Sequence, residues 1–252
     1  MFTAEERNSL RSDLLDRARH DTRLSGAAIT GSAAIRGEDR WSDVDLAFAI
    51  RNAVELPNVL SDWTAQMYEQ YGALHHFDLI AGAWTYRVFL LPNTLQVDLA
   101  FVPAADFRPL SPKFRLVFGE ANEARQVPPQ KIDDIIGLAW LYALHARSCI
   151  ARQKHWQAEY MISGIRDNAF TLASIRHGVP AIHGRGWDQL PKSITNSFEG
   201  TLVRHLESTE LVRAFQAAVS ALLREIRNHD EVLAGKLEAP LTHLIETCFG
   251  VA

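Results

Sequence analysis

The chain has 252 residues, 47% of them hydrophobic and 22% charged, which is ordinary for a soluble globular protein with one large domain or two small ones. Its net charge of −4 argues against a long nucleic-acid partner, and no apolar run approaches the roughly eighteen residues of a membrane span. The two cysteines form no CxxC pair and the N-terminus lacks the pattern of a signal peptide, so we expect a reduced, cytoplasmic protein.

The first elements are a helix and a short strand. Thr3 and Glu6 predict a capping box, and a helical stripe then runs to about His20 through Leu10, Leu14, Leu15 and Ala18. A small-and-apolar strand over residues 26–30 stops at Gly31. Glycine lets the backbone turn sharply and approach a ligand, and the amides of a helical turn that includes Ser32 suit a phosphate. By itself this dipeptide also fits a plain turn.

Residues 43–51 predict a strand with two different faces. One face carries the apolar residues Val44, Leu46, Phe48 and Ile50, and the other carries Asp43, Asp45, Ala47 and Ala49. Both carboxylates therefore project the same way, about 7 Å apart along the strand. Like charges this close need water or a cation between them, and hard ions such as Mg²⁺ bridge carboxylates to phosphates. A solvated strand edge is the alternative.

A third carboxylate follows the same facial pattern later in the chain. After a helix that begins near Pro57 and ends near Tyr71, and a strand over residues 77–80, a hairpin is predicted from residues 84–91 and 95–102. On its second arm, Asp98 shares a face with Gln96 and Ala100, opposite an apolar face. If the two aspartate-bearing strands are neighbours, Asp98 joins Asp43 and Asp45 in one cluster.

These three motifs together resemble the nucleotidyltransferase superfamily, which includes DNA polymerase beta and the aminoglycoside nucleotidyltransferases. The matching residues are Gly31-Ser32, then Ser42-Asp43-Val44-Asp45-Leu46 after nine residues, then Gln96-Val97-Asp98-Leu99. The match covers about residues 24–103. One departure is Ile35, which places Arg36-Gly37 one position later than in many relatives.

The resemblance implies a metal-dependent transfer reaction. Asp43 and Asp45 would hold two Mg²⁺ ions on a nucleoside triphosphate, and Asp98 would complete the second metal site or act as general base. Gly31 and Ser32 would hold the outer phosphates, and Arg36 and Ser42 belong to the same implied nucleotide site. A nucleoside monophosphate would pass to an acceptor hydroxyl with release of pyrophosphate. Relatives often build the cleft from two subunits, so a homodimer is also compatible.

The C-terminal half is predicted to be helical. Proline-containing stretches at residues 108–112 and 127–130 bracket the connection. It includes a short edge strand within residues 113–119, and we set the domain boundary near residue 125. Helices are expected over about residues 132–154, 156–177 and 197–206, then after Ser208, and finally from near Pro240. The first is expected to be central in a bundle, with Trp140 and Leu144 in its stripe, and the second to bury Tyr160.

We therefore predict an α+β protein. Residues 1–125 would form a nucleotidyltransferase domain with a mixed β-sheet flanked by helices, and residues 126–252 an α-helical bundle that binds the acceptor and closes the cleft. Among the polar residues of the bundle, Lys154 and Arg166 are the preferred triphosphate contacts, since lysine and arginine suit phosphate. A solvated helix face is the alternative for both.

The expected function is transfer of a nucleotide to a hydroxyl of a small molecule, such as an aminoglycoside-like antibiotic. Two other functions stay open. A toxin-type enzyme would modify a protein side chain or an RNA end, although the negative net charge counts against RNA. A non-catalytic nucleotide-binding module would keep the fold without the reaction.

Overall fold

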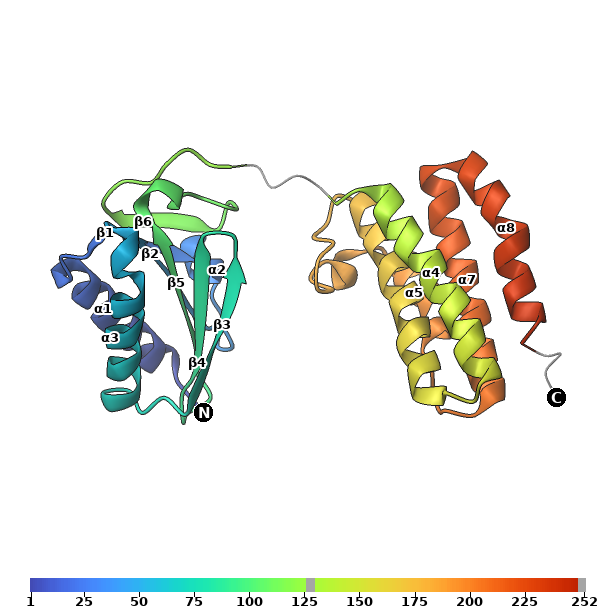
Figure 1. Cartoon of the computed structure of the whole chain (residues 1–252), viewed down its shortest axis with the longest axis horizontal. Coiled ribbons are helices and arrows are strands. Elements are labelled where there is room, and N and C mark those ends of the chain that lie inside the picture. Colours follow the sequence, from blue (N-terminus) through green and yellow to red (C-terminus); the bar gives the residue numbers. More distant parts are fainter. Residues whose placement is uncertain (126–129, 249–252) are drawn as a thin grey trace. The chain divides into compact units, whose positions relative to one another are not determined.

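The structure is a computed structural model that describes residues 1–125 and 130–248, and its chain divides into two compact units, Met1–Pro128 and Pro129–Ala252 (Figure 1). The first unit contains a sheet and helices, and the second is helical, so the predicted α+β class is confirmed. Of the proline stretch expected at residues 127–130, residues 127–129 lie outside the described residues. Within the described ranges, no helix combines the length and apolarity that crossing a membrane requires.

A six-stranded sheet, formed by described residues, is the centre of the first unit. Its order is β3-β4-β5-β2-β1-β6. Only β2 and β5 run parallel, while the other neighbours are antiparallel, so the sheet is mixed as predicted. The predicted hairpin is β4–β5, and the predicted edge strand is β6. The bounds are β1 Leu24–Thr30, β2 Val44–Ile50, β3 His75–Ala81, β4 Trp84–Leu90, β5 Gln96–Pro103 and β6 Phe114–Phe118.

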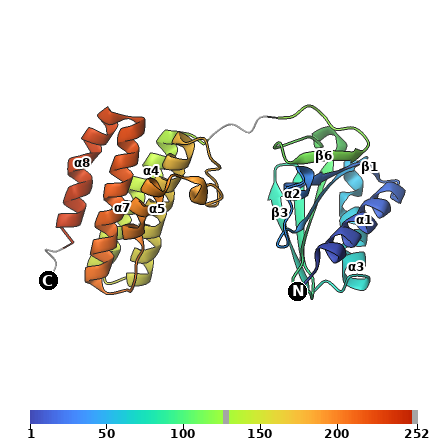
Figure 2. The ribbon, with the colours of Figure 1, turned by 180° about the vertical axis from the view of Figure 1, so that it is seen from behind.

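Two helices, α1 (Ala4–His20) and α3 (Leu56–Glu69), cover one face of this sheet (Figures 1 and 2). The capping box predicted at Thr3 is present, since Thr3 and Glu6 exchange their side-chain and backbone hydrogen bonds. At the centre of the buried layer, the ring of Phe48 lies 4.6 Å from that of Trp63 and 5.3 Å from that of Phe101. The apolar faces predicted for β2 and β5 both point into this layer.

The opposite face of the sheet carries small residues. Ala47, Ala49 and Ala100 are buried there beneath Trp84 and Phe107, the second of which belongs to the segment after β5. This cover lies toward the ends of β2 and β5. At the beginnings of these two parallel strands, the aspartates on the same face are half-buried.

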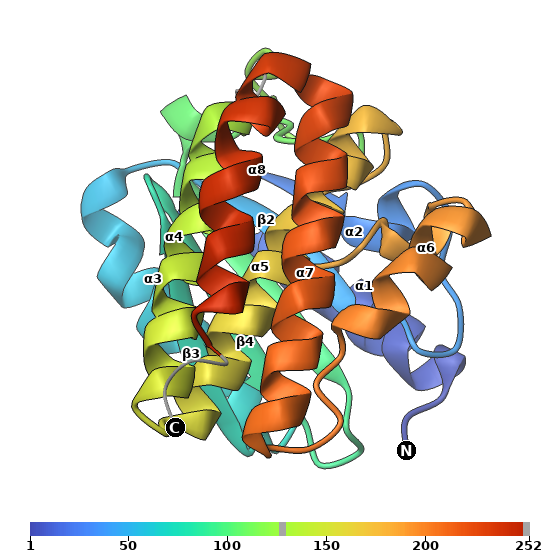
Figure 3. The same cartoon turned by 90° about the vertical axis from the view of Figure 1, so that its right-hand side faces the viewer.

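The second unit is a helical bundle with one hydrophobic core (Figure 3). Helices α4, α5 and α7 pack together and α8 packs on α7 and α4. The helix expected after Ser208 is α7, and its apolar stripe is buried at Leu211, Val212, Phe215, Ala218, Val219, Leu222, Leu223 and Ile226. The bounds are α4 Ile132–Ala151, α5 His155–Arg176, α6 Lys192–Phe198, α7 Ser208–His229 and α8 Glu231–Glu246.

Several predictions about this unit were wrong. The third helix, α6, begins at Lys192 and ends at Phe198, where a 3₁₀ turn over Glu199–Thr201 replaces the expected continuation. The last helix begins at Glu231, not near Pro240, because Asp230 caps it by accepting a hydrogen bond from the backbone N–H of Leu233. Pro240 lies inside the helix and is exposed.

The burial expected for three large side chains was also wrong. Trp140 is 38% exposed, Leu144 42% and Tyr160 62%, so α4 is not surrounded by apolar contacts as a central helix would be. The core positions of α4 and α5 are instead filled by small residues such as Ala139, Ala143 and Ala158. Small side chains let two helices approach closely, which leaves the large ones outside the contact.

Candidate functional site

Three aspartates come together at the beginning of two parallel strands. Asp45 and Asp98 are register partners on β2 and β5, and Asp43 directly precedes β2. One ligand oxygen from each of the three carboxylates lies within 4.8 Å of the others. All three residues are half-buried, so they are reachable from solvent. The cluster that the sequence predicted, conditional on β2 and β5 being neighbours, is therefore present.

The charge within this cluster is moderated by a neutral side chain. Gln96 Nε2 donates a hydrogen bond of 3.0 Å to Asp98 Oδ1 and a longer one of 3.5 Å to Asp43 Oδ2. Burial, reinforced by the negative charge of Asp43, raises the pKa of Asp98 to about 6 in spite of the Gln96 contact. Asp98 is thus a carboxylate that accepts a proton more readily than an ordinary one.

Gly31 approaches the cluster directly. It is the first residue of the short helix α2 (Gly31–Ala34) and has a φ of +63°, a conformation that favours glycine. A Cβ placed on this residue would lie 1.8 Å from Asp45 Oδ2, so only glycine fits beside that carboxylate. The close backbone approach predicted for this position is made to Asp45 in the protein itself. Ser32 follows in α2 and is half-buried.

The loop that leads into β2 is fixed by helix α1. Buried Arg7 donates through Nη1 to the backbone carbonyls of Asp39 (2.6 Å) and Ser42 (3.0 Å). Arg7 and Arg11 both pair with Glu38, at 3.1 and 2.7 Å. These contacts hold the segment immediately before Asp43. Sequence reasoning missed Arg7, although an arginine on the same helical stripe as Leu14 and Ala18 was a usable signal.

The remaining predicted residues of this loop have different surroundings. The Ser42 hydroxyl bonds to Asp39, accepting from its backbone N–H at 2.9 Å and donating to its carboxylate at 3.1 Å. The pKa of Asp39 is lowered, chiefly because its carboxylate accepts the backbone N–H of Trp41 and the Ser42 hydroxyl. Arg36 is exposed and has a φ of +56°. Nucleotide contact by Ser42 and Arg36 stays a prediction.

Lys154 and Arg166 belong to the helical unit, and their predicted phosphate contacts stay predictions. Lys154 is exposed and occupies the cap position before α5. Arg166 pairs with Asp167, with 2.9 Å between Nη2 and Oδ1. It also borders a pocket of about 320 Å³ whose lining includes the three aromatic residues Phe170, Trp187 and Phe198.

The donor set of the aspartate cluster fits a hard divalent cation. Three carboxylate oxygens within 4.8 Å of one another are the ligand type that Mg²⁺ takes, and Mg²⁺ uses few protein carboxylates together with substrate phosphates. Asp43, Asp45 and Asp98 would therefore hold the metal. Within the described residues, no other group of three or more such side chains meets this spacing.

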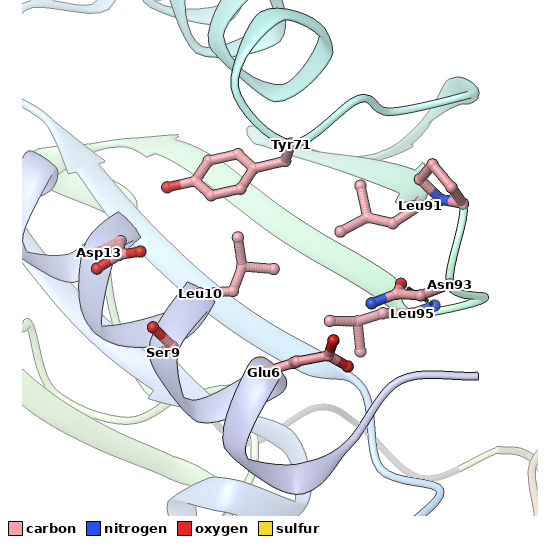
Figure 4. Close-up of a pocket in the computed structure, with 9 residues that line it drawn as sticks. Glu6, Ser9, Leu10, Asp13, Tyr71, Leu91, Asn93 and Leu95 are labelled. Atoms are coloured by element: carbon pink, nitrogen blue, oxygen red, sulfur yellow. Dashed lines mark hydrogen bonds between the residues drawn. The ribbon is translucent and has the colours of Figure 1, made fainter.

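A separate pocket lies on the helix-covered side of the sheet. Figure 4 shows α1 on one side of it and the β4–β5 turn on the other, with Tyr71 and Asp13 near one end and Glu6 and Asn93 near the other. Its volume is about 430 Å³. Its lining includes Leu10, Leu91 and Leu95, which belong to the core beneath the helices, so it is distinct from the aspartate cluster on the opposite face.

Comparisons with known proteins find similar chains among solved structures. No protein-family model matches the sequence, and no match is found among curated proteins. Among solved structures, an aminoglycoside 6-adenyltransferase from Bacillus subtilis aligns over 99% of both chains, with 12% identity and a TM-score of 0.41. By its name, that protein is an aminoglycoside nucleotidyltransferase. A TM-score this low supports no functional conclusion for the present chain.

Proposed function

We propose that this protein is a nucleotidyltransferase that uses Mg²⁺ to transfer a nucleoside monophosphate from a nucleoside triphosphate to a hydroxyl of a small molecule. One observation carries the proposal: Asp43, Asp45 and Asp98 converge within 4.8 Å at the start of parallel strands, beside a glycine backbone that no larger residue can replace. The carboxylates would supply negative ligands for a metal, and the backbone amides at the start of α2 beside them would receive phosphate.

The reaction balances as an in-line displacement at the α-phosphorus. The acceptor oxygen forms a bond to phosphorus, the bond to the oxygen bridging the α- and β-phosphates breaks, and pyrophosphate leaves. The proton of the hydroxyl passes to a carboxylate, for which Asp98 is the best candidate because it lies on β5, the strand of the cluster farther from Gly31. Metal ions held by Asp43, Asp45 and Asp98 would supply positive charge for the entering and leaving oxygens.

The other residues hold the reacting groups. Gly31 and Ser32 bind the outer phosphates through the backbone of α2, and Asp43 and Asp45 keep their position because Arg7 fixes the preceding loop. Gln96 keeps Asp98 and Asp43 oriented through its amide. Arg36, Ser42, Lys154 and Arg166 are proposed to complete the nucleotide site, and the helical unit to contribute to binding of the acceptor.

An acceptor panel with labelled ATP, GTP, CTP and UTP tests the function, with mass spectrometry of the product. Asp45→Asn should lower the rate at least about 100-fold, because it removes a charged ligand oxygen from the centre of the site. Asp13→Asn, an exposed carboxylate of α1, is the matched control and should leave the rate unchanged. An unaltered rate in Asp45→Asn would sink the proposal.

The same panel separates the remaining alternatives. An aminoglycoside-like antibiotic is included as one acceptor, and a protein and an RNA end represent the toxin-type activity. If the wild type binds nucleotide with Mg²⁺ but labels no acceptor and releases no pyrophosphate, it is a nucleotide-binding module. A homodimer is also compatible with the proposal, and light scattering of the purified protein decides that point.

A further inference from the structure

An apolar surface adjoins the aspartate cluster on the same face of the sheet. Phe77 and Leu79 of β3 are 50% and 54% exposed, and Leu90 of β4 is 47% exposed. Tyr86 and Val88 of β4 are half-buried between them. These five residues, Phe77, Leu79, Tyr86, Val88 and Leu90, are called the β3–β4 patch below.

The strand register places this patch beside Asp98. Asp45 pairs with Asp98, Asp98 with Val88, and Val88 with Phe77, which gives one continuous row across β2, β5, β4 and β3. Paired residues of adjacent strands point to the same face of a sheet. At about 4.8 Å per strand, Val88 lies about 5 Å from Asp98 and Phe77 about 10 Å. The neighbouring rows add Leu90 on one side, and Tyr86 with Leu79 on the other.

The charged residues of β3 and β4 lie on the opposite face. Arg87 and Asp78 pair with each other at 2.7 Å, and Arg87 also donates to the backbone carbonyl of Leu60 in α3. On the patch side of these two strands, His75 is the one residue of titratable type beside Tyr86. The patch therefore offers no carboxylate to a polycation.

The strand order decides which substrate this patch faces, provided that the proposed function is correct. Gly31 and Ser32 follow β1 on one side of the aspartates, while β4 and β3 lie on the other side. In an in-line displacement the entering oxygen lies opposite the leaving pyrophosphate. With the outer phosphates at Gly31 and Ser32, the acceptor enters from the side of β4, which pairs with β5 at Asp98.

We propose that the β3–β4 patch binds the acceptor, and that this acceptor carries an apolar or aromatic body next to its reactive hydroxyl. The inference rests on the proposed function and narrows its acceptor class. An uncharged body buries apolar area against Phe77, Leu79 and Leu90, whereas a polycationic aminoglycoside meets no carboxylate on the patch side of β3 and β4. The patch thus sets acceptor specificity, and the aspartates set the chemistry.

Two variants on β3 separate an effect on acceptor binding at the patch from a general effect of changing an exposed apolar residue of this strand. Phe77→Thr removes the exposed aromatic ring of the patch and introduces threonine, a residue that suits a strand. Ile80→Thr is the matched control, because Ile80 is 67% exposed on the other face of the same strand. Both positions are exposed, so neither change should impair folding.

The kinetic test compares 2-phenylethanol, ethanol and kanamycin as acceptors in the full-length enzyme. We expect KM for 2-phenylethanol to be at least about tenfold lower than for ethanol, since a buried phenyl ring contributes more than 1.4 kcal/mol. Phe77→Thr should raise that KM about five- to tenfold and leave KM for ethanol and for the nucleotide unchanged. Ile80→Thr should change none of these values. Equal KM values in wild type and Phe77→Thr, or a preference for kanamycin, would overturn the proposal.

A binding measurement keeps the test decisive if no transfer is seen. Methyl NMR of Leu79, Val88 and Leu90 should show shifts on addition of 2-phenylethanol, which Phe77→Thr weakens and Ile80→Thr does not. Methyl groups that give no shift, or that are already shielded from a soluble paramagnetic probe in the free protein, overturn the patch as a binding surface. Patch binding without transfer to any acceptor, in contrast, identifies failure of the proposed reaction itself.

Discussion

At the residue scale, Gly31 is the position where the backbone conformation and the contact with Asp45 both require glycine. Gly31→Ala should abolish metal-dependent nucleotide binding, because its Cβ would meet Asp45 Oδ2 at 1.8 Å and displace the carboxylate. Gly82→Ala is a close control: its φ of +61° imposes a similar backbone cost of about 1–2 kcal/mol, but nothing lies within 4 Å of the added Cβ. Nucleotide titrations of the two variants distinguish steric displacement from backbone strain. Equal losses in both variants would contradict this account.

Asp98 gives a prediction about pH. Its pKa rises from 3.8 in an ordinary aspartate to about 6 in the folded protein, mainly through burial. The folded state therefore binds this proton more tightly than the unfolded state, so the contribution of Asp98 to stability is fully present below about pH 4 and is lost as pH rises through about 6. In metal-free protein, Asp98→Asn should be about 2–3 kcal/mol more stable than wild type at pH 8, at 1.36 kcal/mol per pKa unit.

The measurement for Asp98 is urea denaturation at pH 4 and pH 8, with and without Mg²⁺. The advantage of Asp98→Asn should nearly vanish at pH 4, where the wild-type carboxyl is protonated in the folded state. Added Mg²⁺ should stabilise the wild type at pH 8 more than the variant. An advantage of equal size at both pH values would show that packing, not ionisation, is responsible.

Individual site residues could be predicted from the sequence where the two-residue alternation of a strand determines the face to which a side chain points. Alternation alone placed Asp43, Asp45 and Asp98 on the faces of their strands that lie opposite the apolar faces. The parallel pairing of β2 and β5 then brings Asp45 opposite Asp98. Gln96 was recognised as a neighbour on that face, but its hydrogen bonds to two aspartates depend on side-chain geometry that no periodicity encodes. Arg7 was missed because its partners lie more than thirty residues away in a loop.

At the element scale, α8 shows how a proline misleads. A proline fits the first turn of a helix, which is why Pro240 predicted a start, yet here it lies past the middle of the 16-residue helix α8. Asp230, the actual cap, lies ten residues earlier and follows α7 almost directly. The elements β2, β5 and α7 were predictable because each buries one face. Apolar residues therefore recur along them at the spacing of a strand or a helix.

Pro240→Ala should stabilise the helical unit. An interior proline removes one backbone hydrogen bond and clashes with the preceding turn, at a cost of up to about 3 kcal/mol, and Pro240 is exposed, so its replacement leaves no cavity. We expect a gain of about 1–2 kcal/mol in thermal or urea denaturation. Thr242→Ala, exposed on the same helix, is the control and should change stability by less than about 0.5 kcal/mol. A destabilised Pro240→Ala protein would mean that the proline relieves a packing conflict.

At the scale of the whole molecule, each unit has hydrophobic clusters of its own. Among the described residues, the cluster around Phe215 contains only residues of the second unit, and the cluster around Phe48 only residues of the first. Phe215→Leu should therefore destabilise the helical unit by about 1 kcal/mol and speed amide exchange in α4, α5 and α7, while exchange in the sheet stays unchanged. Phe48→Leu is the reciprocal variant. Faster exchange in both units after either change would contradict independent cores.

The central claim is that Asp43, Asp45 and Asp98 form one metal site for a nucleoside triphosphate. The most direct test is a titration of Mn²⁺, an electron paramagnetic resonance probe for the Mg²⁺ site, into wild-type protein with each of the four triphosphates. We predict nucleotide-dependent binding that weakens at least about tenfold in Asp45→Asn and is unchanged in Asp13→Asn. Equal Mn²⁺ binding by wild type and Asp45→Asn, with every triphosphate, would contradict the account.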